Sequence, residues 1–174
     1  MDTVEKARQA ATGGYQPVPG ITSFIVADVR ALLAAPLPAD VVEAARQSVL
    51  DWFGIAIGGA DEPLVAMLRD QAREQGGHAQ AEVVFHGEKT STAQAALING
   101  AMADALDFSD ANLAMRGHTT PANVATALAM AEAHGATGGD FLRAVIAGVE
   151  TGCRVGTLVN QPYLRKGFHP TGNL

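Results

Sequence analysis

A run of ionisable residues interrupts an apolar, alanine-rich pattern between residues 99 and 121. Three carboxylates, Asp104, Asp107 and Asp110, follow one another at a spacing of three. Residues three apart lie on one face of a helix, so these carboxylates point the same way if the helix reaches that far. An apolar helical pattern resumes after Pro121. Helix, polar loop and helix is how a bundle presents ionisable groups at a cavity, and the alternative is an ordinary solvated helix end.

Three carboxylates this close repel one another unless a cation lies among them. Arg116 and His118 follow within the same loop, and either can be that cation. Composition by itself favours the solvated helix end over a site.

The chain has 174 residues, a length that fits one domain with a sizeable buried core. Hydrophobic residues make up 48% of it and aromatic residues only 5%, which favours close-packed helices over a β-sandwich. The formal net charge of -6 argues against binding to nucleic acid or to an anionic membrane surface. Small-molecule chemistry remains open.

Cysteine and histidine usage gives no disulfide or metal signature. Cys153 is the only cysteine, and it lies in an apolar helical pattern, where a buried and inert thiol is expected. The five histidines contain no pair at i and i+4, so we predict no metal and no cofactor. Residues 1–20 lack the apolar core of a secretory signal, and no apolar run approaches the roughly 20 residues that span a bilayer. We therefore expect a cytoplasmic protein.

Periodicity predicts a mainly α fold: about six helices, one short strand or hairpin, and a flexible N-terminal tail over residues 1–21. The helices are expected at about residues 22–35, 41–57, 63–76, 92–106, 121–134 and 141–158, the strand at Ala81–Phe85 and a loop at Asn160–Leu174. Gly54 and Gly58 lie four apart on one predicted helix, which indicates close packing of another helix there.

Four groups of residues occur in a specific order along the chain: Asp51-Trp52-Phe53-Gly54, then Leu106-Asp107-Phe108-Ser109-Asp110 with Gly117-His118-Thr119, then Ala147-Gly148-Val149-Glu150, then Gly167-Phe168-His169-Pro170-Thr171-Gly172. Their order and spacing resemble the N-terminal helical domain of the MmgE/PrpD family over about residues 22–174. That family includes 2-methylcitrate dehydratases, cis-aconitate decarboxylases and iminodisuccinate epimerases. The resemblance implies a partial all-α domain over residues 22–174, either a fragment of a longer enzyme or a subunit completed by a second polypeptide. It also implies that the family's active-site lysine and tyrosine and its lid domain lie beyond Leu174.

By matching position, the resemblance gives catalytic roles to His118, His169 and Asp107. The two imidazoles would transfer protons or contact carboxylates, and Asp107 would orient or charge one of them. Substrate-binding roles are implied for Asp110, Arg116, Lys166 and Thr119. For Arg116 and Lys166, exposed surface charge is the alternative.

The chain departs from the family pattern in three places. Ser109 stands where the family usually has an acid, and Thr119 stands where a proline usually follows the histidine. The loop between Asp107 and His118 is one residue longer. These departures leave the substrate open.

The resemblance implies a cofactor-independent lyase, or part of one, that acts on a small polycarboxylate such as 2-methylcitrate or cis-aconitate by elimination or decarboxylation. The alternatives are an iminodisuccinate-type epimerase and a non-catalytic helical subunit that needs a second chain for activity. We expect a homo-oligomer or a second chain as partner, and neither nucleic acid nor a membrane.

Overall fold

The computed structural model describes residues 20–169 and 171. These residues form six α-helices and two short strands: α2 (Ile21–Ala34), α3 (Ala39–Gly59), α4 (Pro63–Gln75), β1 (Ala81–Val83), β2 (Glu88–Thr90), α5 (Thr92–Asp104), α6 (Thr120–His134) and α7 (Gly138–Arg165). The prediction of a mainly α bundle with one strand or hairpin is confirmed. The predicted tail over residues 1–21 lies, up to residue 19, outside the described residues, and Ile21 already belongs to α2.

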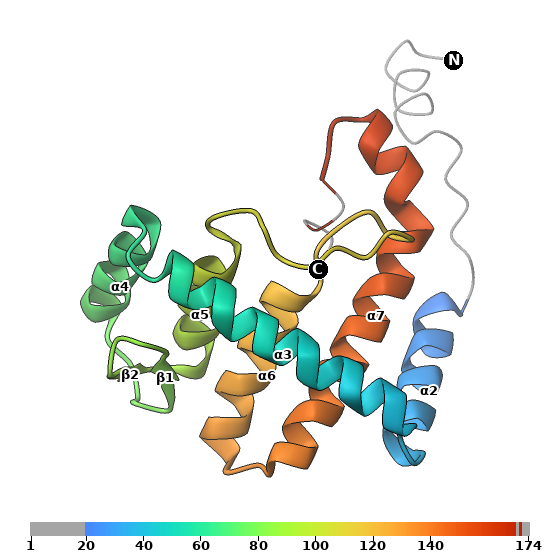
Figure 1. Ribbon diagram of the computed structural model, residues 1–174, viewed down its shortest axis with the longest axis horizontal. Helices are drawn as coiled ribbons and strands as arrows, with labels where there is room; N and C mark the ends of the chain where they lie inside the picture. Colours follow the sequence, from blue (N-terminus) through green and yellow to red (C-terminus); the bar gives the residue numbers. More distant parts are fainter. Residues whose placement is uncertain (1–19, 170, 172–174) are drawn as a thin grey trace, which may run out of the picture.

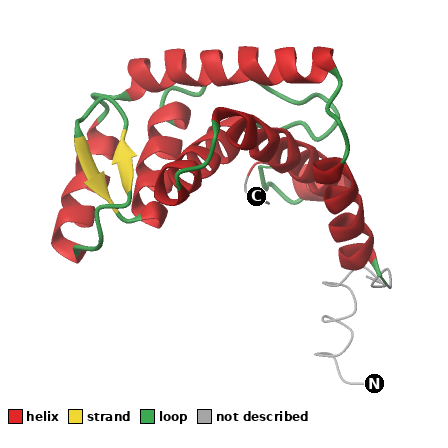
Figure 2. Cartoon of the chain, turned by 90° about the horizontal axis from the view of Figure 1, so that it is seen from below, coloured by secondary structure: helices red, strands yellow, loops and turns green. Residues whose placement is uncertain are grey.

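Helix α3 is the long element that the other helices cross (Figure 1). It contacts α5, α6 and α7, and Figure 2 shows it as a separate layer on one face of them. At one end of α3 lie α4 and the hairpin, and at the other end α2 packs beside α7. The fold therefore consists of two helical layers with the hairpin at one edge.

Trp52 of α3 lies at the centre of the core. Its side chain is fully buried, and its indole Nε1–H donates a hydrogen bond to the Pro121 carbonyl at 3.2 Å, which ties α3 to the first turn of α6. Small and aliphatic side chains surround it, among them Ile55, Ala56, Ile98, Met102, Val124, Ala125 and Val145. Because so many of these side chains are short, the helices approach one another closely.

The closest approach of α3 to α5 depends on Gly59. A Cβ atom at Gly59 would lie 2.1 Å from the Met102 carbonyl oxygen, so no side chain fits there. Gly54 has open space around its Cβ position, and a Cβ at Gly58 would meet Leu106 only at 3.4 Å. The predicted close packing of another helix against α3 is therefore present. It occurs at Gly59, one residue after the predicted pair Gly54 and Gly58.

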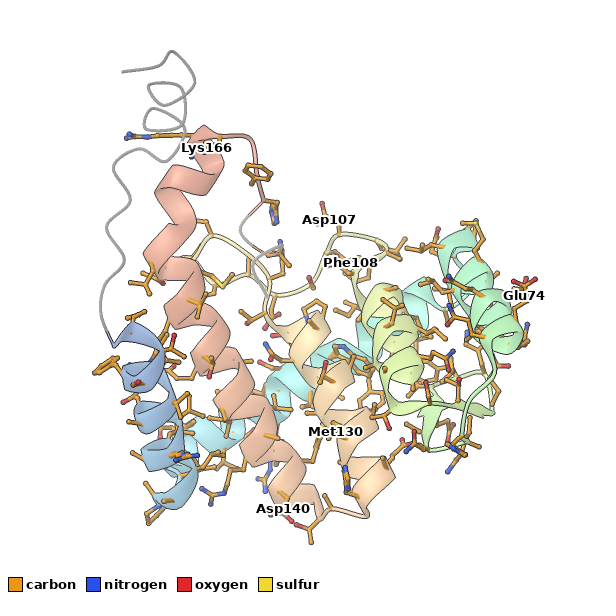
Figure 3. The ribbon with its side chains drawn as sticks, turned by 180° about the vertical axis from the view of Figure 1, so that it is seen from behind. Glu74, Asp107, Phe108, Met130, Asp140 and Lys166 are labelled. Atoms are coloured by element: carbon orange, nitrogen blue, oxygen red, sulfur yellow. The ribbon has the colours of Figure 1, made fainter. Side chains whose placement is uncertain are left out.

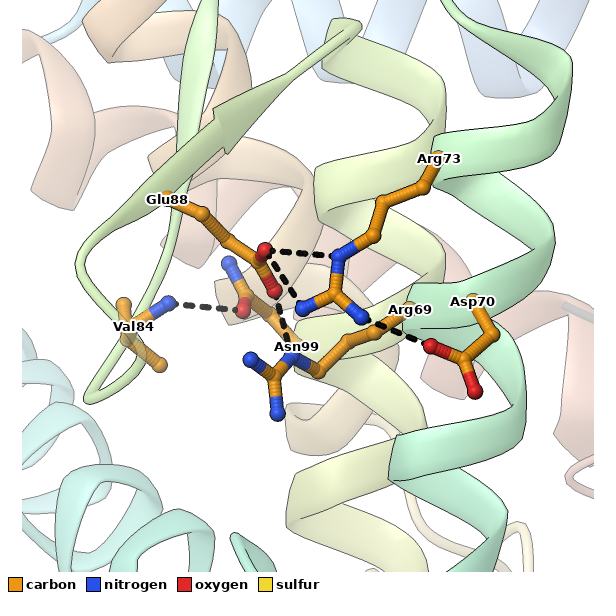
Figure 4. Close-up of polar contacts among 6 residues, drawn as sticks. All are labelled: Arg69, Asp70, Arg73, Val84, Glu88 and Asn99. Carbon is orange, nitrogen blue, oxygen red and sulfur yellow. Dashed lines mark hydrogen bonds and ion pairs between the residues drawn. The ribbon is translucent and has the colours of Figure 1, made fainter.

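A buried asparagine holds the hairpin against the helices. The Asn99 side chain of α5 accepts the Val84 N–H through Oδ1 at 3.1 Å and donates from Nδ2 to the Glu82 carbonyl at 2.9 Å (Figure 4). Asn99 has no exposed surface, so these bonds satisfy polar groups that water does not reach.

An ion-pair cluster ties the same hairpin to α4. The Glu88 carboxylate of β2 binds the guanidinium groups of Arg69 and Arg73, and Arg73 also binds Asp70 (Figure 4). Burial alone raises the pKa of Glu88, but the hydrogen bonds from the two arginines outweigh this, and the pKa lies below its usual value. The stabilisation is therefore present above the ordinary carboxyl pKa and is lost as the pH falls through the lowered pKa of the folded state.

Helix α7 is longer than the sequence indicated. It continues to Arg165, past the predicted end near Leu158, so the predicted loop from Asn160 is wrong over residues 160–165. The helix ends before Gly167, whose φ of 82° lies in the left-handed region that glycine adopts without strain. Although α7 is long, neither it nor any other helix within the described residues is apolar enough to cross a membrane.

The two glycines of α3 give a matched test of this packing. Gly59→Ala should destabilise the full chain by about 3 kcal/mol, because its methyl group meets a backbone carbonyl that cannot move freely. Gly54→Ala should stabilise it by up to about 1 kcal/mol, because alanine favours the helix and meets nothing. Urea unfolding followed by far-UV circular dichroism measures both. Equal unfolding midpoints for the two variants would contradict the assigned contact.

Candidate active site

Helix α5 ends at Asp104, so the predicted common helical face for the three carboxylates is wrong. Asp107 has a left-handed φ of 52°, which aspartate tolerates better than most residues, and its N–H donates to the Asp104 carbonyl at 3.0 Å. The chain therefore leaves the helix in a reverse turn, and both Asp107 and Asp110 lie in the loop between α5 and α6.

The middle of this loop is a tight turn closed by Asn112 and Gly117. The Asn112 N–H donates to the Gly117 carbonyl at 2.9 Å, and the Asn112 side-chain Oδ1 accepts the N–H groups of Ala114 and Met115, each at 3.0 Å. An asparagine that caps its own turn in this way fixes the backbone without help from a regular element. Arg116, with a φ of 58°, lies exposed on this turn.

Met115 packs the loop against α7. Its side chain is fully buried. A Cβ atom at Gly117 would lie 2.8 Å from Met115 Cε, and a Cβ at Gly156 of α7 would lie 2.8 Å from Met115 Cβ. A side chain at Gly156 would meet Met115 Cβ, whereas one at Gly117 would meet only the end of the flexible methionine side chain, so Gly156 is the tighter constraint on how the loop lies on α7.

His118 makes hydrogen bonds through its backbone N–H and through one ring nitrogen. Its N–H donates to Thr171 Oγ1 at 2.8 Å. Its Nδ1 lies 2.9 Å from the Asp110 carbonyl oxygen and 3.1 Å from Ser109 Oγ. Because a carbonyl oxygen only accepts, Nδ1 carries the proton of the neutral ring, and Nε2 keeps its lone pair. His118 is therefore set up to accept a proton at Nε2.

The second predicted histidine lies against the first. The rings of His118 and His169 are stacked, with centroids 5.9 Å apart and planes inclined by 16°. His118 is half-buried and His169 is exposed. Two adjacent imidazoles can divide the acid and base tasks of a proton-transfer reaction.

Asp107 and Lys166 do not join this pair. Asp107 lies on the loop beyond the helix ends, and Lys166 lies at the end of α7 with its side chain directed away from that loop (Figure 3). Within residues 20–169 and 171, neither side chain makes a hydrogen bond or an ion pair. The predicted contact of Asp107 with an imidazole stays a prediction.

Two of the other predicted substrate-binding residues are engaged within the protein. The Asp110 carboxylate accepts a hydrogen bond from the buried Thr120 hydroxyl at 2.6 Å. The Thr119 side chain is buried and its hydroxyl is hydrogen-bonded with the Cys153 thiol. The Arg116 guanidinium is exposed, and it makes no ion pair in the described part of the chain.

A family model, that of the MmgE/PrpD N-terminal domain, matches residues 25–174. The chain belongs to the MmgE/PrpD family. It is similar to the cis-aconitate decarboxylase-like protein oryM of Aspergillus oryzae (strain ATCC 42149 / RIB 40), with 26% identity over 161 residues. The match covers 88% of this chain and 33% of that protein, so the chain spans about a third of the length of this relative.

Sequence reasoning missed three hydroxyl groups of this MmgE/PrpD site. Ser109 was noticed only as a departure from the family pattern, yet its hydroxyl contacts the His118 ring. Thr171 was noticed only as part of a motif, two residues after His169, yet it binds the His118 backbone. Thr120 gave no signal, because its contact with Asp110 depends on the path of the loop.

Cys153 is a poor nucleophile beside this site. Burial raises the pKa of its thiol, and the hydrogen bond with Thr119 lowers it in part, with the net pKa above its usual value. The expected inert thiol is thus half-buried rather than fully buried. In the part of the chain that the structure describes, no group of three His, Cys, Asp or Glu side chains is arranged to hold a metal ion.

Alkylation tests the state of Cys153. Since the raised pKa means that thiolate forms only at higher pH, the pH at half-maximal alkylation rate should be higher in the folded chain than in the urea-unfolded chain. Mass spectrometry after timed iodoacetamide exposure measures the rate at each pH, and the chain contains one cysteine, so the signal is unambiguous. The same midpoint in both states would contradict the assignment.

Proposed function

We propose that this chain carries the proton-transfer histidines of a lyase that acts on small polycarboxylates, such as 2-methylcitrate or cis-aconitate. Membership of the MmgE/PrpD family supports this, since the family includes dehydratases and decarboxylases. Similarity to a cis-aconitate decarboxylase-like protein also supports it. The single observation that carries the proposal is the stacked His118 and His169 pair with the His118 Nε2 lone pair left available.

In an elimination, the Nε2 lone pair of His118 removes a proton from the carbon next to a substrate carboxylate. The C–H electron pair forms the new double bond while the C–O bond breaks. The leaving hydroxide takes a proton from the His169 imidazolium and departs as water. The Asp110 carbonyl and the Ser109 hydroxyl both lie beside Nδ1–H, so they stabilise the charge that His118 gains.

In a decarboxylation, the bond between the substrate carbon and one carboxylate breaks, and CO2 leaves. The electron pair stays on the substrate carbon, and an imidazolium of the pair donates a proton to it. One protonated ring is sufficient for this reaction, whereas elimination requires one neutral and one protonated ring.

Polycarboxylates also need cations that bind them. Arg116 lies two residues before His118 with its guanidinium exposed, and we propose that it contacts a substrate carboxylate. Asp110, Thr119 and Lys166 complete the proposed substrate contacts, with Lys166 required to turn toward the loop. Asp107 keeps its proposed role of orienting or charging one of the imidazoles.

Substitution of each histidine tests the proposed function in the fully assembled protein. His118→Gln and His169→Gln should each lower turnover of 2-methylcitrate or cis-aconitate by about 100-fold or more, because each removes a proton-transfer group. Proton NMR of the products distinguishes loss of water from loss of CO2. The control is His78→Gln, which changes an exposed histidine outside the site. Unchanged turnover in both site variants would remove these residues from the mechanism.

We also propose that part of the surface is covered in the working protein by a second copy of the chain or by a second chain. Leu50, Ile57, Leu106 and Phe108 are exposed by 74%, 60%, 42% and 56%. A Cβ at Gly58 would lie 3.4 Å from Leu106 and 3.5 Å from Phe108, so these side chains continue the surface of α3. Contiguous apolar surface of this kind marks an interaction site.

Sedimentation velocity of the full chain tests this interface. We expect a dimer or larger species, and Ile57→Glu should shift it toward the monomer because a charge would then face an apolar partner surface. The control is Met67→Glu on α4, which changes an exposed apolar residue on a different element. A folded chain that sediments as a monomer at all concentrations would exclude a second copy and leave only a second, different chain as the partner. Full activity of Ile57→Glu in the assembled protein would exclude that partner at this surface as well.

A further inference from the structure

The segment that follows α7 reaches the histidine loop through one threonine. Thr171 lies beyond Gly167, where the chain turns out of α7 with a φ of 82°. Its Oγ1 accepts the His118 N–H at 2.8 Å. This distance is that of a well-formed hydrogen bond, and it joins two segments that are far apart in the sequence. His169, two residues before Thr171, is the residue that stacks on His118.

Gly117 makes this contact possible by leaving space. A Cβ atom there would lie 3.0 Å from the Thr171 nitrogen and 3.1 Å from Thr171 Oγ1. Gly117 is buried, and it is not among the glycines with a positive φ. Glycine is therefore required at this position for the approach of the two segments and not for its backbone conformation.

The His169 ring has little else to hold it in place. The ring is exposed, and its contact within the described residues is the stack on the His118 ring. A single stack between one half-buried ring and one exposed ring is a weak contact, which leaves the His169 ring free to move unless its backbone is fixed. The Thr171 hydroxyl fixes that backbone two residues away.

We propose that Thr171 is a positioning residue: its hydroxyl, by accepting the His118 N–H, holds the segment after α7 on the loop and keeps the His169 ring stacked on His118. The consequence for catalysis rests on the function proposed above. The consequence for the positions of the two rings does not, and the two are tested separately.

The first experiment measures position in the isotope-labelled full chain. Thr171→Val removes the acceptor and keeps the shape, so the His118 amide should exchange with solvent about ten-fold faster. The ring-proton shifts of His118 should move to those seen in His169→Ala, where no second ring is stacked. Thr171→Ser retains the hydroxyl and should behave as the wild type. Thr157→Val, which removes an exposed hydroxyl bonded to a carbonyl of its own helix, is the control.

Gly117→Ala provides a second route to the same result. Its methyl group meets both Thr171 and the end of the Met115 side chain, so the His118 ring shifts should again move toward those of His169→Ala. Thr171→Val leaves Met115 in place and therefore decides which contact is responsible. Slow amide exchange and wild-type ring shifts in Thr171→Val would overturn the proposal, whatever the histidines do in catalysis.

The second experiment measures turnover in the assembled protein. Thr171→Val should lower kcat more than it raises KM, because a displaced His169 slows proton transfer more than it weakens binding, and Thr171→Ser should restore kcat. An unchanged kcat in Thr171→Val, in a protein where His169→Gln has lost turnover, would overturn the positioning role. Unchanged turnover in His118→Gln and His169→Gln would instead overturn the proposed function, and the exchange and shift data would still decide the role of Thr171.

Discussion

The structure of the site depends on the fit of one buried methionine between two glycines. Met115 has no exposed surface, and side chains at Gly117 or Gly156 would occupy its space. Core packing tolerates little change in volume, so this contact fixes how the loop lies on α7. That fit, the Asn112 turn and the hydrogen bond from the His118 N–H to Thr171 together place His118.

A loop fixed in this way can give its histidine a defined protonation pattern. The Asp110 carbonyl lies beside Nδ1 of His118, and the Asp110 carboxylate is in turn bound by the buried Thr120 hydroxyl. The Thr120 hydroxyl holds the Asp110 side chain while the Asp110 carbonyl lies beside the ring, and a carbonyl acceptor at Nδ1 selects one tautomer. In the function proposed above, the Nε2 atom would then act as the base without a prior change of tautomer.

The sequence predicted elements well and contacts poorly. Apolar periodicity located the six helices of the described residues, because each buries one face in a common core. It failed at the end of α7, where the prolines and glycines of residues 160–174 indicate a loop but the helix continues to Arg165. It also failed at Asp107, where a left-handed residue ends the helical path. His118 and His169 were predicted from a resemblance, whereas Thr120 and Thr171 act through the folding of distant segments together, which no local pattern records.

The charges around the site bear on what completes it. Asp104, Asp107 and Asp110 are exposed near the end of α5, while Arg116 is the nearby cation on the loop itself. A polycarboxylate bound as proposed would meet the negative charge of these carboxylates, so further positive charge near the loop would favour its binding. The apolar side chains of Leu106 and Phe108 lie on the same loop and are also exposed. A single partner surface that covers those two side chains and brings cations to the loop would satisfy both requirements, so the apolar and the electrostatic arguments favour the same completed site.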